Sequence, residues 1–157
     1  MSQKMMLREL AFRVNRLMIL GILELVIGIL AVIAGILAPD TVLYGNIGVL
    51  KFLGYTIGFI AILVGTLTIA SALGIPLGVI AEVLTVPFQL RLVTYLSAGK
   101  GIICFISLIW VIGSFSWTPF LFYLFATFID FSITVYGRQL VEWLSYRAPP
   151  KMTFLKL

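Results

Sequence analysis

The chain has 157 residues, of which 62% are apolar and only 11% are charged. Soluble domains average about 45–50% apolar and about 25% charged residues, so this composition excludes an ordinary soluble domain. The net charge of +5 requires no nucleic-acid partner, because anionic lipid headgroups attract basic residues at a membrane surface. We therefore expect a membrane protein that binds no nucleic acid.

Four segments are long and apolar enough to cross a bilayer, since about 20 helical residues cover a hydrocarbon layer roughly 30 Å thick. The first is too long for the apolar part of a signal peptide, and we expect it to remain as a span. The segments are residues 17–38, 52–73, 101–117 and 119–137. The sequence thus predicts an all-α integral membrane protein, a single domain over residues 1–157, with four transmembrane helices in an antiparallel bundle.

The regions around these spans have patterns of their own. Residues 1–16 alternate apolar and basic positions at helical spacing, which predicts an amphipathic interfacial helix. Residues 74–98 are apolar, but their prolines and charged residues argue against a fifth span, so we expect an interfacial or re-entrant segment. Residues 138–157 form a predicted cytoplasmic tail, whose first part, up to Tyr146, continues the fourth helix.

Basic residues predict the orientation of the chain. With four spans, the N-terminus, the middle connection and the C-terminus share one side of the membrane. That side holds ten of the 11 lysines and arginines, Arg91 and Lys100 included, and the opposite side holds only Lys51. Because basic residues mark the cytoplasmic side, we expect both termini there, in the inner (cytoplasmic) membrane of a cell or in an organellar membrane.

Small residues recur at alternating spacings of three and four in the first two spans. Such a repeat keeps one helix face against a neighbour, and small residues let two backbones approach closely within lipid. Glycine and alanine are also common in membrane helices generally. We nevertheless expect these stripes to be packing faces, most simply against each other. The residues are Gly21, Gly28, Ala31 and Gly35 in the first span and Gly54, Gly58, Ala61 and Gly65 in the second.

Two carboxylates, Glu24 and Asp130, lie within the spans. Each is seven residues from the cytoplasmic end of its helix, and so roughly 10 Å below that surface. Thr68 of the second span and Ser107 of the third reach a similar depth. We therefore expect a polar layer to which all four helices contribute.

The sequence leaves three interpretations of this layer open. Buried charges cost about 2.5–3.5 kcal/mol or more, so Glu24 and Asp130 are candidates for a cation, proton or polar-headgroup site. Alternatively, each is protonated and hydrogen-bonds a serine or threonine on another helix; we favour this role for Asp130, and for Glu24 we give it the same weight as a functional site. In the third interpretation, Lys100 or Arg91 reaches inward and pairs with one of the carboxylates.

Other residue types exclude several kinds of site. The chain has no histidine, which excludes histidine-ligated haem and histidine acid–base chemistry. A single cysteine, Cys104, excludes an intrachain disulfide. No glycine-rich phosphate loop follows a strand. We expect no catalytic residues, no metal and no bound cofactor.

Residues 24–28, Glu-Leu-Val-Ile-Gly, resemble the first helix of small multidrug transporters, which carries a membrane-embedded glutamate. The resemblance implies a glutamate in a transport site. It covers only these five residues, and this chain is longer, has the extended connection at 74–98 and adds Asp130. We therefore do not transfer the family's function to this chain.

The function expected from these features is that of a small non-enzymatic polytopic protein, an accessory or structural subunit of a larger membrane complex or of a homo-oligomer. Its expected partners are the lipid bilayer and other membrane subunits or copies of itself. The alternative is an oligomeric cation- or proton-coupled transporter or channel that uses Glu24 and Asp130. A lipid-processing enzyme is the least favoured function.

Overall fold

The computed structural model describes residues 3–37, 48–80, 88–113 and 117–147. Over these ranges the chain forms four helices and no strand: α1 (Gln3–Leu37), α2 (Gly48–Ile80), α3 (Phe88–Ile112) and α4 (Trp117–Arg147). Each helix contains a stretch long and apolar enough to cross a membrane, namely Leu7–Ile36, Phe52–Pro76, Phe88–Ile112 and Trp117–Ser145. The prediction of an all-α multi-pass membrane protein with four spans is confirmed.

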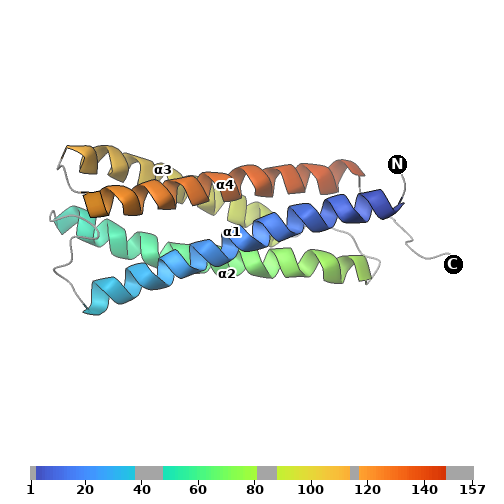
Figure 1. Ribbon diagram of the computed structural model, residues 1–157, viewed down its shortest axis with the longest axis horizontal. Helices are drawn as coiled ribbons and strands as arrows, with labels where there is room; N and C mark the ends of the chain where they lie inside the picture. The colour runs from blue at the N-terminus through green and yellow to red at the C-terminus, as the bar shows by residue number, and fades with distance from the viewer. Residues whose placement is uncertain (1–2, 38–47, 81–87, 114–116, 148–157) are drawn as a thin grey trace.

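The helices pack in two pairs, α1 with α2 and α3 with α4. Smaller contacts of α1 with α4 and of α2 with α3 join the pairs. Figure 1 shows that the beginning of α1 and the end of α4 lie at the same end of the molecule. We call this the terminal end of the molecule.

The α1–α2 contact is made through small residues. A Cβ atom added to Gly28 would lie 2.7 Å from the backbone nitrogen of Ile62, and one added to Gly65 would lie 2.6 Å from the backbone nitrogen of Leu25. Side chains larger than hydrogen would therefore force the two backbones apart. All eight residues expected to pack are buried: Gly21, Gly28, Ala31, Gly35, Gly54, Gly58, Ala61 and Gly65.

The N-terminal stretch differs from the separate interfacial helix that was expected. Residues 3–16 are the first turns of α1, continuous with the first span. Their apolar side chains Leu10 and Val14 are buried in one core cluster with Leu140 and Trp143 of α4. The amphipathic pattern of this stretch thus reflects packing against another helix of the same chain.

The segment at residues 74–98 also differs from the expectation. Residues 74–80 are the last turns of α2, with Pro76 inside the helix, and residues 88–98 are the first turns of α3. The third span therefore begins at Phe88 and not at residue 101. Residues 81–87 of the expected interfacial segment, Ala38 of the expected first span, residues 114–116 of the third and residues 148–157 of the tail lie outside the described residues.

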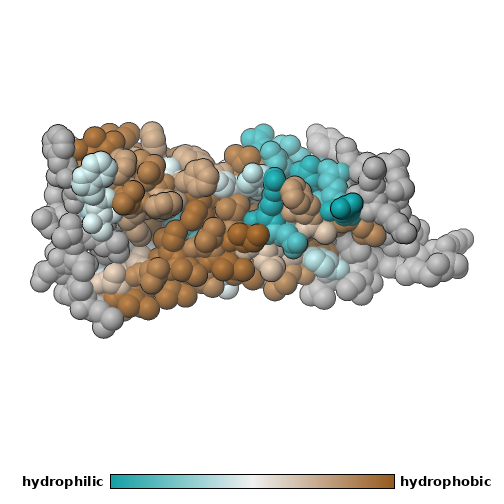
Figure 2. Space-filling view, in the orientation of Figure 1, coloured by the Kyte–Doolittle hydropathy of each residue, from teal (hydrophilic) through white to brown (hydrophobic). Residues whose placement is uncertain are grey.

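The surface of the molecule is apolar over most of the described helices. Figure 2 shows hydrophilic residues gathered over the C-terminal part of α4 and the adjoining part of α1. Along α4 the exposed side chains are apolar at Phe125, Phe128 and Val135, and polar at Arg138 and Gln139. The apolar part of the surface, which we call the apolar band, therefore ends near residue 136 of α4.

Candidate functional site

Three charged side chains meet inside the molecule. They are Glu24 of α1, Lys100 of α3 and Asp130 of α4, and none is more than 1% exposed. The ammonium group of Lys100 lies 2.6 Å from Oδ2 of Asp130 and forms a second ion pair with Oε1 of Glu24. We call these three residues the ion network.

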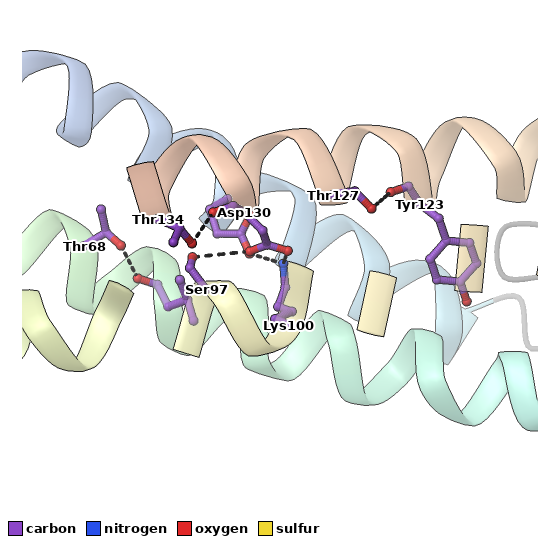
Figure 3. Close-up of polar contacts among 9 residues, drawn as sticks. Thr68, Ser97, Lys100, Tyr123, Thr127, Asp130 and Thr134 are labelled. Carbon is purple, nitrogen blue, oxygen red and sulfur yellow. Dashed lines mark hydrogen bonds and ion pairs between the residues drawn. The ribbon is translucent and has the colours of Figure 1, made fainter. Parts of the chain in front are cut away.

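Neighbouring polar groups hold Asp130 in place (Figure 3). Ser97, one turn before Lys100 on the same face of α3, donates a hydrogen bond of 3.4 Å to Oδ1 of Asp130. Thr134 donates a hydrogen bond of 2.8 Å to the backbone carbonyl oxygen of Asp130. A Cβ atom on Gly101 would lie 3.1 Å from Cβ of Asp130, so α3 and α4 approach closely at this level. Both carboxylate oxygens of Asp130 therefore have a partner on α3.

The position of Lys100 differs from the expected one, which was in the cytoplasmic connection between the second and third spans. Lys100 lies within α3, and its side chain is buried. Of the three interpretations of the polar layer, the third matches the structure for Lys100, because this basic side chain reaches inward to the carboxylates. Arg91 does not take part, because it is exposed on the surface of α3.

Thr68 and Ser107 are buried, but they do not join the ion network. Thr68 donates a hydrogen bond of 2.6 Å to the carbonyl oxygen of Val64, and Ser107 donates one of 2.9 Å to that of Ile103. Such bonds within one helix satisfy the hydroxyl groups locally. Ser107 also lies seven residues from Lys100, or roughly 10 Å along the axis of α3. The expected layer with a polar group from every helix is thus replaced by a network of three helices.

The ion network has more carboxylates than ammonium groups. With every group ionised its net charge is −1, and with one bound proton it is neutral. Within the described part of the chain, Oε2 of Glu24 and the hydroxyl of Ser71 on α2 are buried without a hydrogen-bond partner. The network could therefore hold its own helices together, exchange a proton, or do both.

The geometry provides little for other chemistry. Among the described residues, no group of three or more His, Cys, Asp or Glu side chains is placed to hold a metal ion. The ammonium group of Lys100 contacts both carboxylates, and so takes the place that a bound cation would need between them. Cys104 is a buried free thiol one turn from Lys100.

No protein-family model, no curated protein and no solved structure matches this chain. A functional proposal therefore rests on the geometry of the helices and of the ion network.

Proposed function

We propose that this protein is a non-enzymatic structural or accessory subunit of a membrane assembly, either a larger complex or a homo-oligomer. The observation that carries the proposal is the ion network, in which Lys100 binds Asp130 of its own helix pair and Glu24 of the other pair. The side chain of Lys100 occupies the space between the two buried carboxylates. This arrangement suits a fixed four-helix unit.

The network joins two helix pairs that share smaller contacts with each other than the helices share within each pair. Close glycine contacts join α1 to α2, whereas the two pairs share smaller contacts. Breaking a buried ion pair by removing one partner costs about 3–5 kcal/mol. A shift of one helix pair relative to the other would separate Lys100 from Glu24 and leave charges without partners inside the bilayer. The network therefore disfavours other arrangements of the two helix pairs. Because the helix pairs then keep one arrangement, the protein presents a constant outer surface to a neighbouring subunit.

The basic residues support the orientation that belongs to this proposal. Arg8, Arg13 and Arg16 on α1 and Arg138 on α4 lie toward the terminal end of the molecule. Basic residues face the cytoplasm in most membrane proteins. We place both termini on the cytoplasmic side of the inner (cytoplasmic) membrane of a cell, or on the equivalent side of an organellar membrane.

Native mass spectrometry of the chain, extracted from its own membrane in mild detergent, tests the proposal. We expect a fixed stoichiometry, either with other polypeptides or with copies of the chain. The Lys100→Met variant should lose this stoichiometry, whereas Gly99→Ala should keep it, because an added Cβ on Gly99 meets nothing within 4 Å. A monomer without partners would contradict the proposal.

A second candidate function is supported by the charge imbalance of the network. With two carboxylates for one ammonium group, an oligomer of this chain would have a protonatable group inside each protomer. Such a group would bind and release the proton of a proton-coupled transporter or channel. Proton flux into liposomes that contain the purified protein tests this function. The flux should be lost in Glu24→Gln, and flux equal to that of protein-free liposomes would exclude proton transport.

A further inference from the structure

An open groove lies between α3 and α4, in their parts nearest the terminal end of the molecule. Its volume is about 540 Å³. Its lining includes Arg91, Thr94 and Tyr95 of α3 and Thr134, Arg138 and Glu142 of α4. The floor is tight, since a Cβ atom on Gly137 would lie 2.6 Å from Cγ2 of Thr94. We call this feature the α3–α4 groove.

The α3–α4 groove has an excess of positive charge. Arg91 is exposed and makes no ion pair with any described residue. Arg138 contacts Glu142 at 3.1 Å, but both side chains are more than half exposed, and such surface pairs are weak. A guanidinium group offers five donors in a planar fork that matches a phosphate group. Two arginines on facing helices therefore suit a phosphate.

The α3–α4 groove lies at the depth of lipid headgroups. Arg138 is eight residues beyond Asp130, or roughly 12 Å along α4 toward the terminal end. The last exposed apolar side chain of α4 before Arg138 is Val135. The arginines thus stand at the edge of the apolar band, where the phosphates of a bilayer lie.

Apolar side chains continue the α3–α4 groove toward the middle of the membrane. Ile102 follows Tyr95 by seven residues, and Phe131 precedes Arg138 by seven, so each lies two helical turns deeper on the same face. Both are exposed, at 54% and 41%. The Phe131 ring comes within 3.7 Å of a Cβ atom placed on Gly101, at the contact of the two helices. The surface therefore offers arginines for a headgroup and apolar side chains for acyl chains.

A smaller groove between α1 and α4, of about 250 Å³, has arginines that are already engaged. Arg13 pairs with Glu9 at 2.9 Å. The Arg16 guanidinium lies 4.0 Å from the centre of the Phe12 ring and 5.6 Å from that of Tyr136. Both guanidinium groups of the smaller groove thus already contact a carboxylate or a ring, whereas Arg91 of the α3–α4 groove makes no ion pair with any described residue.

We infer that the α3–α4 groove binds one anionic phospholipid. Arg91 and Arg138 contact its phosphate, and its acyl chains lie along Ile102 and Phe131. The site is separate from the ion network and does not depend on the proposed function. A free phosphate ion would satisfy the arginines, but it would leave the apolar half of the surface without a partner.

Native mass spectrometry of the detergent-purified full chain, titrated with phosphatidylglycerol or with phosphatidylcholine of the same acyl chains, tests the inference. We expect one phosphatidylglycerol to bind in preference to phosphatidylcholine. An arginine near an anionic headgroup contributes on the order of fivefold in affinity, so Arg91→Gln/Arg138→Gln should weaken phosphatidylglycerol binding by roughly 20-fold or more. Glu142→Gln should strengthen it, because the substitution removes the negative charge beside Arg138.

Two controls separate this site from other sources of binding. Arg8 is exposed on α1 and does not line the α3–α4 groove, so Arg8→Gln should leave the affinity unchanged. An equal loss in Arg8→Gln and in the double variant would show diffuse attraction by the basic surface and would overturn the inference. Displacement of the lipid by inorganic phosphate at submillimolar concentration would assign the site to the free ion, and would also overturn it.

Discussion

Lys100 contacts both buried carboxylates, and this double contact determines how each residue of the ion network responds to substitution. Its pairs with Glu24 and Asp130 form among side chains that are almost completely buried. In such surroundings the attraction between opposite charges is large, but so is the cost of a charge without a partner. Removing the lysine and removing one carboxylate are therefore not equivalent changes.

Lys100→Met should lower the free energy of unfolding by about 3–5 kcal/mol, because it leaves two buried carboxylates without their common partner. Unfolding by a denaturing detergent, followed by circular dichroism, measures the change. Gly99→Ala is the matched control on the adjacent residue, and it should change stability by less than about 0.5 kcal/mol. Equal stability of Lys100→Met and the unsubstituted protein would mean that the network contributes nothing to the fold.

Asp130→Asn and Glu24→Gln should each have a smaller effect, about 1–3 kcal/mol, because the remaining carboxylate and Lys100 still form a neutral pair. The same unfolding measurement compares them with Lys100→Met. Asp130→Asn also changes the group that accepts the hydrogen bond of Ser97. We therefore expect Asp130→Asn to lower the free energy of unfolding more than Glu24→Gln does. If either variant lowered the free energy of unfolding more than Lys100→Met does, this assignment of charges would be contradicted.

At the scale of the helices, the glycines of α1 and α2 determine how closely the first pair packs. Gly28 and Gly65 face backbone atoms of the opposite helix, which cannot move aside as a side chain could. The Tyr55 hydroxyl adds a polar contact by donating a hydrogen bond to the Gly35 carbonyl oxygen. Association within lipid depends on this close packing, since water provides no hydrophobic driving force there.

Gly28→Ala should destabilise the protein by about 1–3 kcal/mol, because the added methyl group would overlap the backbone of Ile62 and Gly58 and push the helices apart. The thermal unfolding midpoint in detergent measures the effect. Gly74→Ala in α2 is the control, since an added Cβ there meets nothing within 4 Å. If both substitutions behaved alike, the glycine contact would not hold α1 against α2.

At the scale of the whole molecule, two helix pairs are joined by smaller contacts and by the ion network. The core cluster that contains Leu10 and Val14 of α1 and Leu140 of α4 adds an apolar contact between the pairs near the terminal end. The network lies deeper, with Asp130 two turns of α4 before Gly137. A second cluster, with Ile57 of α2 and Leu108 of α3, adds another apolar contact between the pairs. The relative position of the pairs thus depends on apolar contacts and on one charged contact.

The number of spans could be predicted from the sequence because apolar length is a strong signal in a bilayer. The glycine stripes could also be found, since their spacing repeats over several turns. The position of Lys100 was missed for a physical reason. A lysine beside Gly99 and Gly101, after a stretch with prolines and Arg91, has the composition of a connection between helices. The extent of α3 depends on partners from other helices, which no local pattern contains.

One signal in the sequence could have placed Lys100 correctly. Ser97, Lys100, Cys104 and Ser107 recur at spacings of three and four, the same spacing that identified the packing faces of the first two spans. All four are buried in α3. The first turns of α1 were misplaced for a related reason, because an amphipathic pattern does not tell whether its apolar face meets lipid or protein.

The ion network is best tested by measuring the unfolding free energy of Glu24→Gln/Lys100→Met/Asp130→Asn and comparing it with that of Lys100→Met alone. If the three charges form one network, the two further substitutions remove the unpaired carboxylates that Lys100→Met leaves behind. The triple variant should then be the more stable of the two, by about 1–4 kcal/mol. If instead the three losses add and the triple variant is the less stable, the three side chains do not form a common network.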